Sequence, residues 1–109
     1  MTDGRHAVAE ETSLQLHRAV AERLRAEPSL VERARRRVED WLREETVARP
    51  YAEAWREILS RPAGEVARFL EDPGERARQL RQTSPFAGFL DARTRWAVWR
   101  RARHGTVWP

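Results

Sequence analysis

The stretch that decides the fold is residues 49–80, RPYAEAWREILSRPAGEVARFLEDPGERARQL, in which three proline-marked breaks separate apolar residues at helical spacing. Pro50 opens the first helix, because proline at the first helical position gives up only an N–H that has no partner there. Pro62 opens the second helix in the same way. Asp72, Pro73 and Glu75 supply an N-cap, a proline and an acidic first-turn residue for the third. The predicted apolar stripes are Tyr51, Trp55, Ile58 and Leu59; Val66, Phe69 and Leu70; and Ala77 and Leu80.

Two more helices are predicted upstream, each starting at a capping box in which a hydroxyl and a Gln or Glu side chain satisfy exposed backbone N–H groups. The boxes are Thr12 with Gln15 and Ser29 with Glu32. The first helix is expected to end near Ala26. The second is expected to run toward Ala48. Residues 1–10, which lack a periodic pattern, are predicted to form a flexible tail.

A last helix is predicted downstream, capped by Asp91, carrying Trp96 and Trp99, and ended by Gly105. No segment alternates with period two, as a half-buried strand would. The sequence therefore predicts an all-α fold, a compact bundle of five or six helices with a Ser-Pro-Phe loop before the last helix. Residues 11–104 are expected to form a single helical domain, and residues 105–109 a C-terminal tail.

Composition limits the class of protein. A chain of 109 residues without Cys has no disulfide framework and no thiolate site. The N-terminus lacks an export-signal pattern, and no apolar run approaches the ~20 residues of a membrane helix. We therefore expect a soluble cytoplasmic protein.

Charge is distributed unevenly along the chain. Residues 1–72 hold 13 Arg against 15 Asp and Glu, a net charge of −2, whereas residues 73–109 hold 8 Arg against 2 acidic residues, a net charge of +6. The basic part also holds five of the nine aromatic residues. A positive surface with large apolar anchors is typical of a site for a protein partner or a nucleic acid.

Catalytic chemistry has little support in the sequence. His6, His17 and His104 are not at metal-ligand spacing, and they are expected to face solvent or cap helices. No phosphate-binding loop and no nucleophile elbow is present. We expect a non-enzymatic protein without metal or cofactor.

Residues 65–82 resemble a helix-turn-helix, the basis of an alternative function as a DNA-binding transcriptional regulator. Its possible DNA-binding residues are Arg76, Arg78, Arg81 and Gln82. The turn lacks the usual Gly, so a plain helical hairpin with solvated arginines is the favoured interpretation.

The segment Leu80-Arg-Gln-Thr-Ser-Pro-Phe-Ala-Gly-Phe-Leu90, followed by Arg95-Trp96 and Arg100, resembles small all-helical bacterial antitoxin-like proteins. The similarity extends to Leu16-His17 and to residues 53–59, and it spans most of residues 14–103. The resemblance implies a protein that neutralises a cognate toxin, for which it suggests the nucleotidyltransferase type, by protein-protein contact.

The loop has a restricted backbone, because Pro85 fixes its own φ, biases Ser84 away from helix and precedes a flexible Gly88. Such a loop can present Phe86 and Phe89 to a partner at low ordering cost. The alternative is that these rings turn inward and fill the core. The predicted partner-binding residues are Arg81, Gln82, Ser84, Pro85, Phe86, Phe89, Arg95, Trp96 and Trp99.

Overall fold

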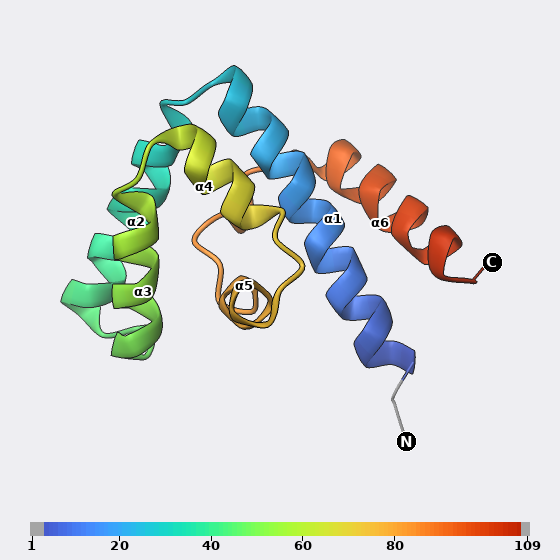
Figure 1. The fold of residues 1–109 in the computed structure, drawn as a ribbon, viewed down its shortest axis with the longest axis horizontal. Helices are drawn as coiled ribbons and strands as arrows, with labels where there is room; N and C mark the ends of the chain where they lie inside the picture. The colour runs from blue at the N-terminus through green and yellow to red at the C-terminus, as the bar shows by residue number, and fades with distance from the viewer. Residues whose placement is uncertain (1–3, 108–109) are drawn as a thin grey trace.

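The computed structural model describes the backbone of residues 4–107 and the side chains of residues 9–102. This part of the chain folds into six α-helices without a strand, as predicted (Figure 1). The helices are α1 (Gly4–Ala26), α2 (Leu30–Glu44), α3 (Arg49–Leu59), α4 (Ala63–Leu70), α5 (Glu75–Arg81) and α6 (Ala92–Val107). Within the described range, no helix is both long enough and apolar enough to cross a membrane.

Helix α1 is the axis of the molecule. It packs mainly against α4 and α6, while α2 and α3 form a hairpin at the other end of the bundle. In Figure 1 the α2–α3 hairpin lies at the left, and α6 lies along the right side of α1. The loop that connects α5 to α6 passes behind α4 and α1 in this view.

The core lies where α1 to α4 meet, and Trp55 of α3 is its largest fully buried side chain. The Trp55 indole Nε1 donates a hydrogen bond to the Leu80 carbonyl at 3.1 Å, which satisfies the ring's only polar group. Its ring meets Phe69 edge-on at 5.7 Å. Leu24, Val38, Ile58, Leu59, Val66 and Leu70 complete the fully buried centre.

The predicted start of the first helix is wrong. Helix α1 begins at Gly4, so most of the expected flexible tail is helical, and Thr12 is a buried residue inside the helix instead of its N-cap. Residues 5–11 include several good helix formers. Glu10 also pairs with Arg78 of α5 at 3.4 Å, which ties this turn to the bundle. Residues 1–3 lie outside the described part.

The predicted end of the last helix is also wrong, because α6 continues through Gly105 to Val107. Glycine inside a helix costs about 1 kcal/mol and does not oblige it to end. Trp108 and Pro109 lie outside the described residues, as do the side chains of His6 and His104.

The other helix boundaries agree only in part with those predicted from capping residues in the sequence. Helix α2 ends at Glu44, earlier than the expected run toward Ala48, because Glu45 adopts a left-handed conformation with φ 56°. Ser29 is the N-cap residue of α2, although its side chain forms no capping hydrogen bond. At α6 the Asp91 carboxylate accepts the Thr94 N–H at 2.7 Å, which confirms the predicted cap. That bond holds the pKa of Asp91 below its ordinary value.

Helix α5 starts at Glu75, later than the expected cap at Asp72. Gly74 is its N-cap residue, and the Asp72 carboxylate accepts the Gly74 N–H at 2.7 Å. This Asx turn explains the shift, because the Asp side chain organises the turn before the helix instead of its first turn.

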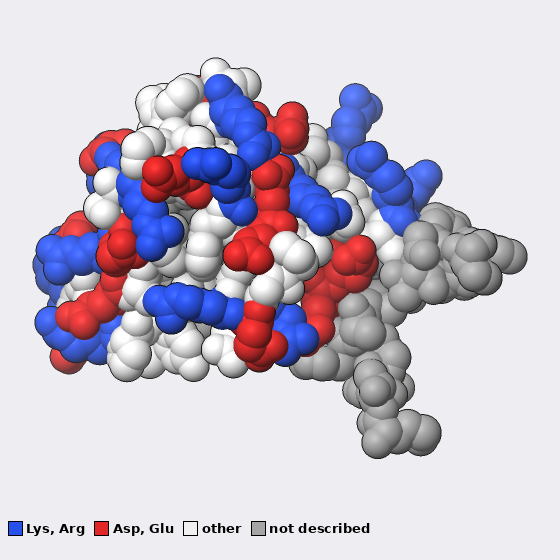
Figure 2. All heavy atoms as spheres, viewed as in Figure 1, with Lys and Arg blue, Asp and Glu red and all other residues white. Residues whose placement is uncertain are grey.

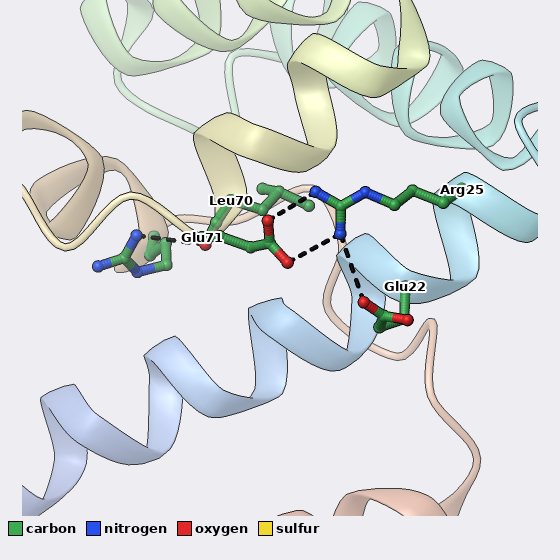
Figure 3. A network of polar contacts seen from close by, with 5 residues as sticks. Glu22, Arg25, Leu70 and Glu71 are labelled. Carbon is green, nitrogen blue, oxygen red and sulfur yellow. Dashed lines mark hydrogen bonds and ion pairs between the residues drawn. The ribbon is translucent and has the colours of Figure 1, made fainter.

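The end of α1 is fastened to the end of α4 by an ion pair. The Arg25 guanidinium faces both carboxylate oxygens of Glu71, at 2.9 and 2.7 Å, and lies 3.4 Å from Glu22 (Figure 3). The contact with Arg25 lowers the pKa of Glu71. The pair fixes the turn from which the chain enters α5.

Candidate functional site

The Ser84–Leu90 loop turns its aromatic side chains inward. Phe86 and Phe89 are 3% and 6% exposed, and their rings meet edge-on at 5.0 Å. Phe86 also lies edge-on to Trp55, with ring centroids 6.2 Å apart. The preceding residue, Pro85, is fully buried. The prediction that Phe86, Phe89 and Pro85 form a partner surface is therefore wrong, and the alternative of a core plug is confirmed. Burying each ring contributes about 1.5–3 kcal/mol, which favours the inward arrangement.

A histidine on α1 fixes the start of the loop. His17 Nδ1 lies 2.8 Å from the Ser13 carbonyl, and Nε2 lies 2.8 Å from the Ser84 hydroxyl. A carbonyl only accepts, so the ring proton is on Nδ1, and the Ser84 hydroxyl donates to Nε2. The same hydroxyl accepts the Phe86 N–H at 3.1 Å. Ser84 thus joins α1 to the loop backbone.

His17 is 9% exposed, so the expectation that it faces solvent is wrong. Burial lowers its pKa to about 4, against the opposing effect of the hydrogen bond to Ser13. The ring is therefore neutral at pH 7, which leaves Nε2 unprotonated and able to accept the hydrogen bond from Ser84. This residue carries no recognisable signal in the sequence, because its partner Ser84 is 67 positions away.

The His17–Ser84 hydrogen bond resembles the one between a serine nucleophile and its histidine general base in an enzyme. Two features indicate that this contact has a structural role instead. Pro85 follows the serine and has no N–H with which to stabilise an oxyanion. A pKa near 4 also makes His17 a weak base at neutral pH. The pair holds the loop in place.

Three arginines from α1 and α2 hold the remainder of the loop. Arg37 donates to the Pro85 and Ala87 carbonyls at 2.9 and 2.7 Å. Arg23 donates to the Phe89 carbonyl at 3.2 Å, and the Arg33 guanidinium lies 4.4 Å above the centre of the Phe89 ring. The loop's carbonyls therefore have charged donors, whose hydrogen bonds are about twice as strong as neutral ones. Sequence reasoning did not identify any of these arginines.

The residues predicted to contact DNA differ in their exposure and in their contacts. Arg81 is 6% exposed, and its Nη1 donates to the backbone carbonyls of Asp72 and Leu70, so it is not the solvent-facing side chain that contact with a DNA backbone or base edge requires. Arg78 pairs with Glu75 and with Glu10. Arg76 and Gln82 are exposed. The DNA-binding assignment of Arg81 is wrong for a physical reason: its cation closes the α4–α5 turn.

Helix α6 presents the second part of the predicted site. Trp96 is 55% exposed, and its ring stacks on that of half-buried Trp99, with centroids 4.8 Å apart and planes 17° from parallel. Val98 and Ala102 are the buried residues of α6 and lie on its inner face. The tryptophan pair is therefore formed in the free protein at the edge of the bundle.

The charge of α6 differs from that of the rest of the bundle. Arg93, Arg95, Arg100 and Arg101 are all exposed, the helix contains no Asp or Glu, and none of the four forms an ion pair with a described residue. Figure 2 shows basic side chains projecting at the right of the molecule, where α6 lies in Figure 1. Elsewhere in the described chain, Arg25, Arg35, Arg43, Arg49, Arg56, Arg61 and Arg78 each pair with a carboxylate, whereas the exposed Arg18, Arg36, Arg68 and Arg76 do not. What distinguishes α6 is that it carries four exposed arginines and no acidic residue of its own.

We call the exposed residues Arg93, Arg95, Trp96, Arg100 and Arg101, with Trp99 beneath Trp96, the α6 face. Among the described residues there is no group of His and carboxylate side chains suited to hold a metal ion. Comparison with protein-family models, with curated proteins and with solved structures finds no match to this chain. The α6 face and the Ser84–Leu90 loop that leads into α6 together form the candidate functional site.

Proposed function

We propose that this chain is an antitoxin-like protein that binds and neutralises a cognate toxin by protein-protein contact, with the α6 face as its contact surface. The observation that carries the proposal is the exposed Trp96, stacked on Trp99 among arginines that have no ion-pair partner in the described part of the chain. The resemblance noted in the sequence supports the same assignment, because Arg95-Trp96 and Arg100 belong to its pattern.

Tryptophan and arginine are the residues that most often dominate protein interfaces. A ring that is already stacked loses little side-chain freedom on binding, so more of its burial energy goes into affinity. Trp96 has this arrangement in the free protein.

The positive charge of the α6 face indicates what kind of surface its partner should have. Several arginines without carboxylates favour a partner that is acidic around an apolar pocket, and the attraction accelerates encounter. On the α2–α3 hairpin, by contrast, Arg35, Arg43 and Arg56 are neutralised by pairs within the chain. The α6 face is therefore the surface we expect a toxin to use.

The Ser84–Leu90 loop has a supporting role in this proposal. It leads directly into the Asp91 cap of α6, and its backbone is held by His17, Arg23 and Arg37. A fixed loop sets where α6 begins relative to α1, and so pre-organises the face.

Co-expression with the product of the adjacent gene tests the proposal. We expect the two proteins to co-purify, the complex to weaken as salt is raised, and the toxicity of the adjacent gene product to be relieved. If that product is toxic alone but neither binds nor is inhibited by this chain, the proposal is wrong.

A further inference from the structure

Arg81 is a buried cation that forms no ion pair with a carboxylate of the described residues. Its Nη1 donates to the Asp72 carbonyl at 2.6 Å and lies 3.4 Å from the Leu70 carbonyl. Its Nε and Nη2 form no hydrogen bond to any described residue. The side chain therefore retains donors that the folded chain does not use.

These donors are not sealed in the core. Within the described residues, no fully buried side-chain nitrogen or oxygen lacks a hydrogen-bond partner. Since Nε and Nη2 of Arg81 have no such partner, each of them keeps some solvent-accessible surface, although the residue is only 6% exposed. Arg81 lines two pockets of about 350 Å³ each, which share Arg81 and Gln82 in their walls.

One of these pockets lies between α1, the Ser84–Leu90 loop and the first turn of α6. Its walls are mainly apolar, and Arg95 of α6 contributes to the lining. Gln82 and Ser84 add polar groups near Arg81. The apolar lining residues include Leu16, Val20, Phe86 and Leu90.

The electrostatic surroundings of Arg81 favour an anion. Burial lowers the pKa of its guanidinium, the carboxylate of Asp72 opposes this, and the charges of Arg18 and Arg78 lower it further. Arginine nevertheless remains protonated in proteins. A buried charge with incomplete pairing is unfavourable, and a bound anion would relieve that cost.

We propose that this pocket binds a small organic monoanion, with the carboxylate on the free Arg81 donors and an apolar body against the Leu16, Val20 and Leu90 walls. The planar guanidinium offers Nε and Nη2 side by side, the arrangement that matches the two oxygens of a carboxylate. The proposal does not rest on toxin binding, because the anion is held by Arg81 inside the pocket and Arg95 is the one residue of the α6 face that also lines it.

NMR of the arginine side chains in the intact protein tests this without a substitution at Arg81. Hexanoate is titrated as the probe, with hexanol and inorganic phosphate as matched controls that keep only the apolar body or only the charge. We expect a saturable shift of the Arg81 Nε–H signal with hexanoate alone. The Arg37 Nε–H signal should not move, because Arg37 does not line this pocket.

Two substitutions on α6 locate the site. Arg95→Gln removes a charge from the pocket wall, whereas Arg100→Gln removes one from the same helix away from the pocket. We expect the hexanoate Kd to rise roughly threefold for the first, the effect of one exposed charge, and to stay unchanged for the second. Absence of a hexanoate shift, or an equal shift with hexanol or with phosphate, would overturn the proposal.

Discussion

The imidazole Nε2 of His17 lies 2.8 Å from the hydroxyl of Ser84, a contact that joins residues 67 positions apart. It connects the middle of α1 to the first residue of the loop that carries Phe86 and Phe89. The loop is thereby part of the core, and Trp96 on α6 is the aromatic residue of the predicted partner site that stays exposed.

Removing the Ser84 hydroxyl tests this connection. Ser84→Ala leaves His17 Nε2 and the Phe86 N–H without their partner, so we expect the free energy of unfolding to fall by about 1–3 kcal/mol in urea denaturation. Ser60→Ala is the control, because the Ser60 hydroxyl donates only to the nearby exposed Glu57 carbonyl. Equal effects of the two substitutions would contradict the role of Ser84.

The pH dependence of stability tests the buried state of His17. Its folded-state pKa of about 4 lies below the ordinary value of 6.5, so between these values the unfolded chain binds more protons. Stability should be full above pH 6.5, decrease as pH falls toward 4, and lose about 3 kcal/mol from this group.

His17→Gln provides the comparison for that pH series. The carboxylates titrate in both proteins, so the difference between their stability curves isolates the contribution of His17. A wild-type curve parallel to that of the variant between pH 6.5 and 4 would show that the histidine is not buried in its neutral form.

The core position of the loop aromatics predicts a large effect on stability. Phe86→Ala should cost about 3–5 kcal/mol, because it removes a buried ring that contacts both Trp55 and Phe89. Tyr51→Ala, at an exposed site on α3, should change stability by no more than about 0.5 kcal/mol. Thermal unfolding of both variants measures this. A Phe86 variant that melts like wild type would place the ring at the surface.

The two glycines Gly88 and Gly64 form a matched pair for the loop backbone. Neither has an atom within 4 Å of an added Cβ, but Gly88 has φ +83° whereas Gly64 lies in α4. Gly88→Ala should destabilise the protein by about 1–2 kcal/mol, and Gly64→Ala should stabilise it by about 0.5–1 kcal/mol. Effects of the same sign would contradict the left-handed turn at Gly88.

Substitutions at Arg37 and its neighbour Arg36 test the hydrogen bonds between Arg37 and the loop carbonyls. Arg37→Met removes two charge-assisted hydrogen bonds to the loop and should cost about 1.5–3 kcal/mol. Arg36→Met alters an exposed side chain with the same helix propensity. Urea denaturation should therefore give a lower free energy of unfolding for the Arg37 variant than for the Arg36 variant. Equal stability of the two variants would show that the hydrogen bonds of Arg37 do not hold the loop.

Much of the fold could be predicted from local signals. Pro50 opens a helix and Asp91 caps one because both effects depend only on neighbouring backbone groups. The start of α1 was missed because it depends on distant contacts, such as Glu10 with Arg78, that outweigh the local capping box at Thr12.

The candidate site was harder to predict. Phe86 and Trp96 are both large aromatic residues in a basic region, and only the packing of α1 and α2 separates the buried ring from the exposed one. His17, Arg23 and Arg37 contact the loop from 48 to 67 positions away. In the sequence they look like the other polar residues of solvated helices.

The most direct test is the affinity of the adjacent gene product for Trp96→Ser compared with Tyr51→Ser, measured by titration calorimetry. These substitutions remove the two large hydrophobic residues that are exposed in the described part of the chain. If α6 is the contact surface, Trp96→Ser should raise Kd about 30-fold, or ~2 kcal/mol, at an unchanged melting temperature, and Tyr51→Ser should have no effect. Unchanged affinity of the Trp96 variant would contradict the assignment of the α6 face.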